Sequence, residues 1–336
     1  MPTGGRRYLS IAGAVALGVL LLMGLTRAQP FAPNDQLAYF GRTLVAAVGL
    51  APASAQSGKP AANAGARSVC YGPETAAGFR ECQFTDADGQ KMNFLLYTPV
   101  SQDRQRKYPL VLVLHGGGER AKPGMTPQAS HALLAGASYV KIWGLGATGT
   151  DAPGIQARWP SFVVVPQLTY PDRWVDVPPA HGSYALAAKP TVELRLAKEI
   201  VDEVQREYGG VDADRRYITG ISLGGYGTWD AIERWPRYFA AAVPVAGAGD
   251  PAKAYVLKDL PIWAFHGAAD PIVPVSGSRD MVAAIRAAGG QPRYTEYADA
   301  EHAIWPQVYA LDERGQTSDV FAWLFAQRLP TASNPH

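Results

Sequence analysis

Residues 220 to 225 form the pattern Gly-x-Ser-x-Gly-Gly, with Ser222 at its centre, and they complete an apolar run that begins near Arg216. Such a pattern is typical of a nucleophile elbow, a sharp turn between a strand and a helix that holds a serine in a strained backbone conformation. A Cβ at Gly220 or Gly224 would collide with the turn, and Gly225 lets the following helix pack close to the sheet. The pattern predicts that Ser222 is a nucleophile, but it is short, so its interpretation depends on partners elsewhere in the chain.

A serine hydroxyl is a poor nucleophile at neutral pH, so it needs a base within hydrogen-bond reach and an acid that orients the base. In chains with such an elbow the acid and then the histidine follow the serine. Asp270 lies in a loop after the apolar run 261–266 and is the predicted acid, although an aspartate before proline could also cap the next helix. His302 follows the run 293–297 by a short loop and is the predicted base.

The other five of the six histidines fit the role of the base less well. His115 precedes a glycine run upstream of the serine, and His266 ends an apolar run and is more typical of a buried structural imidazole. His131 and His181 lie in the long connections, and His336 is terminal.

A glycine-rich segment upstream predicts the third part of the site. The fully apolar run 108–114 leads into His115 and then Gly116, Gly117 and Gly118. Glycines let backbone N–H groups come close to an oxyanion, and each such donor contributes roughly 2.7–4 kcal/mol in known cases. We predict that the amides of Gly117 and Leu223 form an oxyanion hole, the alternative being a tight glycine turn without a ligand.

From about residue 80, short β-rich runs alternate with helical periodicity. This predicts an α/β fold with a mostly parallel central sheet and helices on both faces, and a site at the carboxyl ends of the strands. The long connections 120–160 and 168–190 are expected to form a substrate pocket, with Trp174 and Trp305 as candidate walls or as ordinary core residues. We expect strands at 91–98, 108–114, 161–166, 216–221, 240–245, 261–266 and 293–297, and helices at 191–208, 223–235, 274–288 and 318–328.

The start of the chain differs from the rest in composition. A basic pair, Arg6 and Arg7, precedes an apolar stretch to residue 25, which predicts a signal peptide or membrane anchor at residues 1–28. Residues 29–69 are rich in Ala, Pro and Gly and are expected to be a disordered linker, and residues 70–330 the catalytic domain. The protein is therefore expected to be exported to the periplasm or secreted, and to meet a membrane only through this anchor.

The cysteines and the net charge indicate which kinds of bond, site and partner to expect. In an exported protein Cys70 and Cys82 are expected to form a disulfide, the alternative being two buried thiols. Neither cysteine lies in a pattern that predicts a metal site. The formal net charge is +2 among 336 residues, and no Lys/Arg-rich run occurs, so nucleic-acid binding is not expected.

Several motifs together resemble the serine esterase and predicted-peptidase branch of the α/β-hydrolase superfamily, which is related to polyhydroxybutyrate depolymerases, feruloyl esterases and dienelactone hydrolases. The likeness covers roughly residues 80 to 328. It rests on the segments 94–99, 115–120, 165–167, 220–225 and 263–267, with Asp270 and His302.

The resemblance implies a carboxylesterase that uses no cofactor and acts on a small-molecule or polymeric ester through an acyl-enzyme. Two alternatives stay open, a serine peptidase of the same fold and a non-catalytic, envelope-anchored binding protein on this scaffold. The resemblance does not fix the acyl or alcohol group, because this fold hosts many chemistries.

Overall fold

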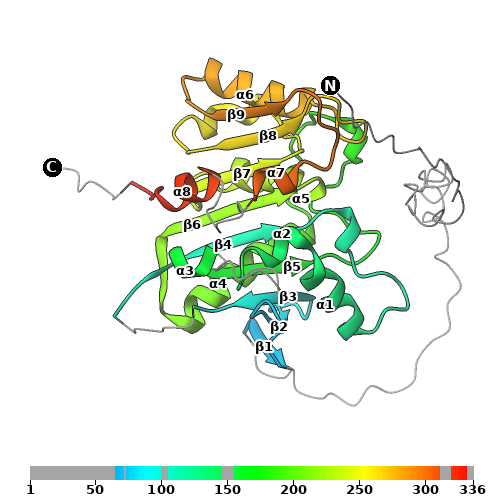
Figure 1. Cartoon of the computed structure of the whole chain (residues 1–336), viewed down its shortest axis with the longest axis vertical. Coiled ribbons are helices and arrows are strands. Elements are labelled where there is room, and N and C mark those ends of the chain that lie inside the picture. The colour runs from blue at the N-terminus through cyan, green and yellow to red at the C-terminus, as the bar shows by residue number, and fades with distance from the viewer. Residues whose placement is uncertain (1–64, 72, 100–104, 146–154, 311–318, 331–336) are drawn as a thin grey trace, which may run out of the picture. The chain divides into compact units, whose positions relative to one another are not determined.

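The computed structural model describes residues 65–71, 73–99, 105–145, 155–310 and 319–330 (Figure 1). The expected signal peptide or anchor at residues 1–28 and most of the expected linker lie outside these residues. Among the helices of the described segments, none combines the length and the apolar character that a bilayer crossing requires.

One mixed sheet of nine strands organises the described residues, in the order β1-β2-β3-β5-β4-β6-β7-β8-β9 (Figure 1). The six strands from β5 to β9 along this order run parallel, and β1, β2 and β3 pair antiparallel at one edge. The strands are β1 (Arg67–Tyr71), β2 (Arg80–Thr85), β3 (Lys91–Tyr97), β4 (Tyr108–Leu114), β5 (Phe162–Gln167), β6 (Val211–Ile221), β7 (Ala241–Val245), β8 (Trp263–Gly267) and β9 (Arg293–Tyr297).

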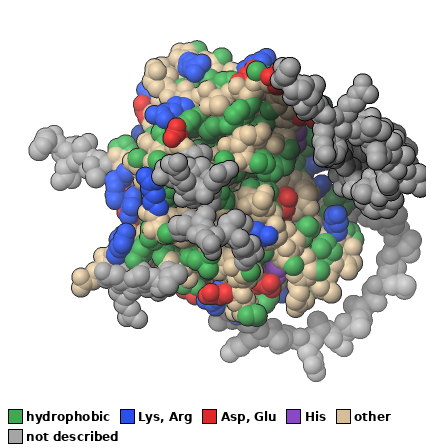
Figure 2. Space-filling view, viewed as in Figure 1, with side chains coloured by type: hydrophobic (Ala, Val, Ile, Leu, Met, Phe, Trp, Pro, Cys, Tyr) green, Lys and Arg blue, Asp and Glu red, His purple; other side chains and the backbone are tan. Residues whose placement is uncertain are grey.

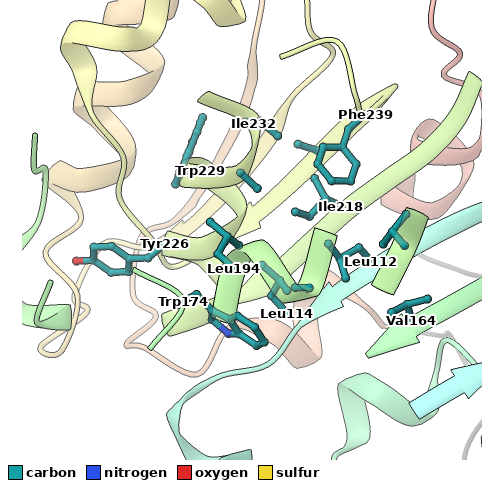
Figure 3. Close-up of a cluster of buried hydrophobic side chains, with 14 of the residues drawn as sticks. Leu112, Leu114, Val164, Trp174, Leu194, Ile218, Tyr226, Trp229, Ile232 and Phe239 are labelled. Atoms are coloured by element: carbon teal, nitrogen blue, oxygen red, sulfur yellow. The ribbon is translucent and has the colours of Figure 1, made fainter. Parts of the chain in front are cut away.

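The central strands are buried on both faces because their side chains alternate between two hydrophobic clusters. In β4, Leu112 and Leu114 belong to one cluster, and Val111 and Val113 belong to the other. Figure 3 shows part of the first cluster, where side chains from the sheet meet those of helices α4 and α5. An apolar run without alternation, as in 108–114, is what such a doubly covered strand requires.

Helices cover both faces of the sheet, which confirms the predicted α/β-hydrolase architecture. The first cluster includes side chains from α4 (Val192–Tyr208), α5 (Leu223–Arg234), the 3₁₀ helix η5 (Pro251–Leu257) and α6 (Ser276–Ala287). The second includes side chains from α1 (Pro127–Gly136), α2 (Ser138–Lys141), α3 (Ile155–Arg158), α7 (Trp305–Val308) and α8 (Asp319–Phe325). Two further 3₁₀ helices, η3 (Gly117–Glu119) and η4 (Pro179–His181), lie in the connections.

The edge hairpin of β1 and β2 carries the disulfide. Cys70 and Cys82 are register partners on the two antiparallel strands, and their sulfurs are bonded, as predicted. β1 begins at Arg67, so residues 67 to 69 belong to this strand and differ from the expected linker that runs to residue 69. The backbone pairing of Arg67 with Thr85 holds these residues in the sheet although their composition resembles a linker.

The surface carries both signs of charge. Basic and acidic side chains are interspersed with hydrophobic ones on the face shown in Figure 2. This mixture follows from the nearly balanced composition of 31 Lys and Arg against 29 Asp and Glu.

Candidate active site

Ser222 occupies the turn between β6 and α5 and has a backbone conformation that few side-chain-bearing residues adopt. Its φ is 54° and its ψ is −116°, so it lies on the positive side of φ where an L-residue is strained. The Ser222 amide donates to the carbonyl of Val245 at the end of β7 with an N–O distance of 2.9 Å. This hydrogen bond to the neighbouring strand β7 helps to hold the strained residue in place.

The glycines around Ser222 are required by close backbone contacts. A Cβ on Gly220 would lie 2.3 Å from the carbonyl oxygen of Gly224, and one on Gly224 would lie 2.0 Å from that of Leu114. A Cβ on Gly225 would lie 2.4 Å from the carbonyl oxygen of Val245. These contacts agree with the expected roles of the glycines, because no alanine fits without movement of backbone.

The three residues expected to form the catalytic centre lie within hydrogen-bond distance of one another. Nε2 of His302 is 2.9 Å from Oγ of Ser222. Nδ1 of the same ring is 2.7 Å from Oδ2 of Asp270. The three residues come from the loops after β6, β8 and β9, which end at the same edge of the parallel sheet. This arrangement allows a proton to pass from the serine hydroxyl to an imidazole that a carboxylate orients.

Asp270 is held as a carboxylate by several donors. Its Oδ1 accepts hydrogen bonds from the amides of Ile272, at 2.8 Å, and Val273, at 2.9 Å. Burial alone would raise the pKa of Asp270, but hydrogen bonds from His266 and His302 outweigh burial and hold the pKa well below its usual range. The negative charge therefore persists beside His302, where it can stabilise an imidazolium.

His115 supports the glycine-rich loop, and the sequence alone did not reveal this role. The ring has no exposed surface, and its Nε2 accepts from the amide of Leu168 at 2.9 Å. Nδ1 therefore carries the proton and donates to the carbonyl of Gly116 at 2.6 Å. Burial lowers the pKa of His115 to about 4, so the ring is neutral at neutral pH. Its partner lies 53 positions away in sequence, so no local signal could have revealed this role.

The residues that carry the expected oxyanion donors, Gly117 and Leu223, are neighbours in the fold. Gly117 begins η3 and Leu223 begins α5, and the first amides of a helix have no partner within it. A Cβ on Gly117 would be 3.6 Å from Cδ1 of Leu223, an ordinary contact. The loop is also held by Tyr139, whose hydroxyl accepts from the amide of Gly116 at 3.3 Å. Nothing in the sequence around Tyr139 indicated this contact.

The two tryptophans that are candidate pocket walls or core residues have different positions. Trp174 is fully buried, its Nε1 donates to the carbonyl of His115 at 3.0 Å, and its ring packs edge-on against His115. Of the two alternatives, this burial fits the core residue and not the pocket wall, and the side chain supports the glycine-rich loop. Trp305 is partly buried and packs edge-on against the ring of His302, with ring centroids 5.7 Å apart.

The described segments also bear on metal binding. Within them, no group of three or more His, Cys, Asp or Glu side chains is placed to hold a metal ion.

Comparisons with known proteins show which families and structures this chain is similar to. The model of the prolyl oligopeptidase family matches residues 193–264, which include β6, the elbow and α5. The crystal structure of a thermostable esterase superposes with a TM-score of 0.56 and 33% identity, covering 75% of this chain and 63% of that chain.

Curated relatives are similar over shorter stretches. The protein named "Putative esterase NocK" of Nocardia uniformis subsp. tsuyamanensis is 28% identical over 195 residues, which are 57% of this chain and 49% of that protein. The bifunctional acetylxylan esterase/xylanase XynS20E of Neocallimastix patriciarum is 28% identical over 83 residues, or 25% of this chain and 12% of that protein. The chain thus spans half or less of the length of these relatives.

The fold and the relatives lead to the same assignment. The mostly parallel sheet carries a serine elbow after β6, and the matched family and the superposed esterase share this fold class. The resemblance seen in the sequence motifs is confirmed at this level. The chain has the α/β-hydrolase fold and is similar to esterases of that fold.

Proposed function

We propose that this chain is an exported serine carboxylesterase with Ser222, His302 and Asp270 as its catalytic residues. The observation that carries the proposal is the continuous hydrogen-bonded chain from Asp270 through His302 to Ser222, with the serine held at positive φ on the elbow. In serine hydrolases this constellation activates a hydroxyl for attack on a carbonyl carbon.

In the first half of the reaction, Oγ of Ser222 attacks the ester carbonyl while Nε2 of His302 takes the hydroxyl proton. Asp270, kept ionised, stabilises the imidazolium that forms. The carbonyl π electrons move to the oxygen, and the amides of Gly117 and Leu223 donate hydrogen bonds to this oxyanion. When the oxyanion collapses, the bond to the alcohol breaks and the imidazolium gives its proton to the leaving alkoxide.

In the second half, water replaces the alcohol. His302 takes a proton from the water as it attacks the acyl carbon, and a second oxyanion occupies the same hole. Its collapse breaks the bond to Oγ of Ser222, which regains the proton from His302 as the carboxylic acid leaves. Enzyme and imidazole end as they began, so no cofactor is consumed.

A peptide bond is the second candidate substrate, because the matched family is the prolyl oligopeptidase family. An ester is the better candidate, since an alcohol leaves more readily than an amine and the relatives above are named as esterases. Turnover of a matched pair, an ester and an amide with the same acyl group, separates the two. A kcat/KM for the amide equal to or above that for the ester would favour the peptidase.

Export is supported by the disulfide between Cys70 and Cys82, because such bonds persist mainly in oxidising compartments. The basic and apolar pattern of residues 1–28 supports it as well. Fractionation of cells that express the full chain, or a chain without residues 1–28, tests this part. Retention of the full chain in the cytoplasm with reduced cysteines would contradict it.

The activity itself is tested with p-nitrophenyl acetate and Ser222→Ala. We expect kcat to fall by about 10⁴-fold or more with an unchanged circular dichroism spectrum, since the variant lacks the nucleophile. Ser138→Ala at the exposed start of α2 is the matched control and should keep full activity. Undiminished hydrolysis by Ser222→Ala would refute the assignment.

A further inference from the structure

His266 contacts the catalytic acid but takes no part in the mechanism above. It lies in β8, has no exposed surface, and its Nδ1 is 2.7 Å from Oγ of Ser278 on α6. Its Nε2 is 3.1 Å from the carbonyl oxygen of Val273 and 3.3 Å from Oδ2 of Asp270. A buried imidazole with polar partners at both nitrogens is fixed in one orientation.

The partners determine which nitrogen of His266 carries a proton. The carbonyl of Val273 and the carboxylate of Asp270 can only accept hydrogen bonds, so Nε2 must donate. The oxygen of Asp270 that it faces is Oδ2, which also accepts from Nδ1 of His302. Two imidazoles therefore share one carboxylate oxygen, while the backbone amides of Ile272 and Val273 hold the other.

We propose that His266 is a positioning residue, which fixes the carboxylate of Asp270 by donating to Oδ2, the oxygen that Nδ1 of His302 also contacts. The inference rests on the proposed function of the same site. Without His266, Oδ2 would keep His302 as its one imidazole donor among the described residues, and the carboxylate could tilt about its held Oδ1. The imidazole of His302 would then lose its orientation toward Ser222.

The contacts of His266 also connect the acid to the elbow. Oγ of Ser278 is 3.1 Å from the carbonyl oxygen of Gly247, and a Cβ on Gly247 would meet the backbone of Gly225 at 2.3 Å. Gly225 lies in the first turn of α5, three residues after the nucleophile. The path from Asp270 through His266 and Ser278 thus ends against the helix that presents Ser222.

Charged groups around His266 are few in the described residues. On β9, Glu296 is its register partner, and that carboxylate is bound by the guanidinium of Arg279, 2.6 and 2.9 Å away, and by the hydroxyl of Tyr294. Asp270 lies at Nε2, and His302 lies beyond Asp270. Asp270 is thus the carboxylate that His266 contacts directly.

A matched pair of variants separates the two ring nitrogens. In His266→Gln the side-chain amide reaches the position of Nε2 and can still donate to Asp270, whereas in His266→Asn it reaches only the position of Nδ1. We expect His266→Asn to lower kcat by about tenfold to a hundredfold with KM within about twofold, because the acid is misplaced. His266→Gln should stay within about threefold of the unsubstituted protein.

The second readout is the ¹H NMR signal of the proton between Nδ1 of His302 and Oδ2 of Asp270, which needs no substrate. We expect this signal to shift in His266→Asn and to keep its position in His266→Gln, because only the glutamine amide can still donate to Oδ2. A merely structural histidine would lower stability and activity in both variants without this difference. If the unsubstituted protein hydrolyses no ester, the proposed function fails, and the proton signal still decides the role of His266.

Three results would overturn the inference. They are an unchanged kcat in His266→Asn, an equal loss in His266→Gln, and an unchanged His302–Asp270 proton signal in His266→Asn. A measurement on the unsubstituted protein covers the case in which the asparagine variant does not fold. Its ¹⁵N spectrum should show a proton on Nε2 of His266 at pH 7, and an Nε2 without a proton would also overturn the inference.

Discussion

Replacing Gly225 by alanine should force helix α5 away from strand β7. The new Cβ would lie 2.4 Å from the carbonyl oxygen of Val245 and 3.1 Å from backbone atoms of Gly247. Ordinary carbon–oxygen contacts begin near 3.4 Å, so the first contact is about 1 Å too close. Both neighbours are backbone atoms in the strand and in the segment after it, so the helix must move.

The size of the effect follows from this overlap. A shift of about 1 Å at the start of α5 displaces Ser222 and the amide of Leu223, and a misplacement of that size can lower kcat by about a hundredfold. Overpacking lowers the free energy of unfolding by about 1–3 kcal/mol, and the better helix propensity of alanine offsets up to about 1 kcal/mol of this loss. We therefore expect Gly225→Ala to lose kcat strongly and to lose about 1–2 kcal/mol in free energy of unfolding.

Gly136→Ala is the matched control, because Gly136 is also helical and a Cβ there meets nothing within 4 Å. Both variants are assayed with p-nitrophenyl acetate and unfolded in urea. The control should keep full activity and be as stable as the unsubstituted protein or slightly more stable. Full activity and stability of Gly225→Ala would refute the argument that this close contact positions the nucleophile.

Other predictions concern the parts that hold the site. His115 takes up a proton below about pH 6.5 in the unfolded chain but only near pH 4 in the folded chain. This group alone should therefore lower the free energy of unfolding by about 3 kcal/mol as the pH falls from about 6.5 to about 4. Urea unfolding at pH 7 and 4.5 should show this component, and His115→Asn should lack it; an equal pH dependence in both would contradict it. Trp174→Phe removes a donor to the His115 carbonyl, so it should lower the free energy of unfolding by about 1–3 kcal/mol and lower kcat more than it changes KM. An unchanged kcat and melting temperature would contradict this. Replacing Cys70 and Cys82 together by serine should cost about 2–3 kcal/mol in urea, and no loss would mean that the bond adds no stability.

The order of motifs along the chain was enough to predict the fold class and the three residues that meet at the site. Apolar runs such as 108–114 and 161–166 indicate buried parallel strands wherever they occur, so their interpretation needed no tertiary information. The turn after residue 221 likewise follows from local demands, since only glycines fit around Ser222.

Long-range contacts account for what the sequence could not reveal. His115 and Trp174 were assigned by position, and both act through partners more than 50 residues away in the chain. His266 was interpreted as a structural imidazole, which is correct for its burial but says nothing of its contact with Asp270. The pairing of β3 beside β5 is equally non-local, because sequence patterns show that strands exist and not which strands are neighbours.

The central claim is that Ser222 is a nucleophile activated by His302, and a fluorophosphonate probe tests it most directly. Such a probe reacts only with an activated serine, and the modified residue is located by mass spectrometry of peptides. We predict one adduct, on Ser222, that forms rapidly in the unsubstituted protein and at least about 10³-fold more slowly in His302→Ala. Labelling on another serine would contradict the account. A folded protein that stays unlabelled would contradict it as well and would favour a binding protein on a hydrolase scaffold.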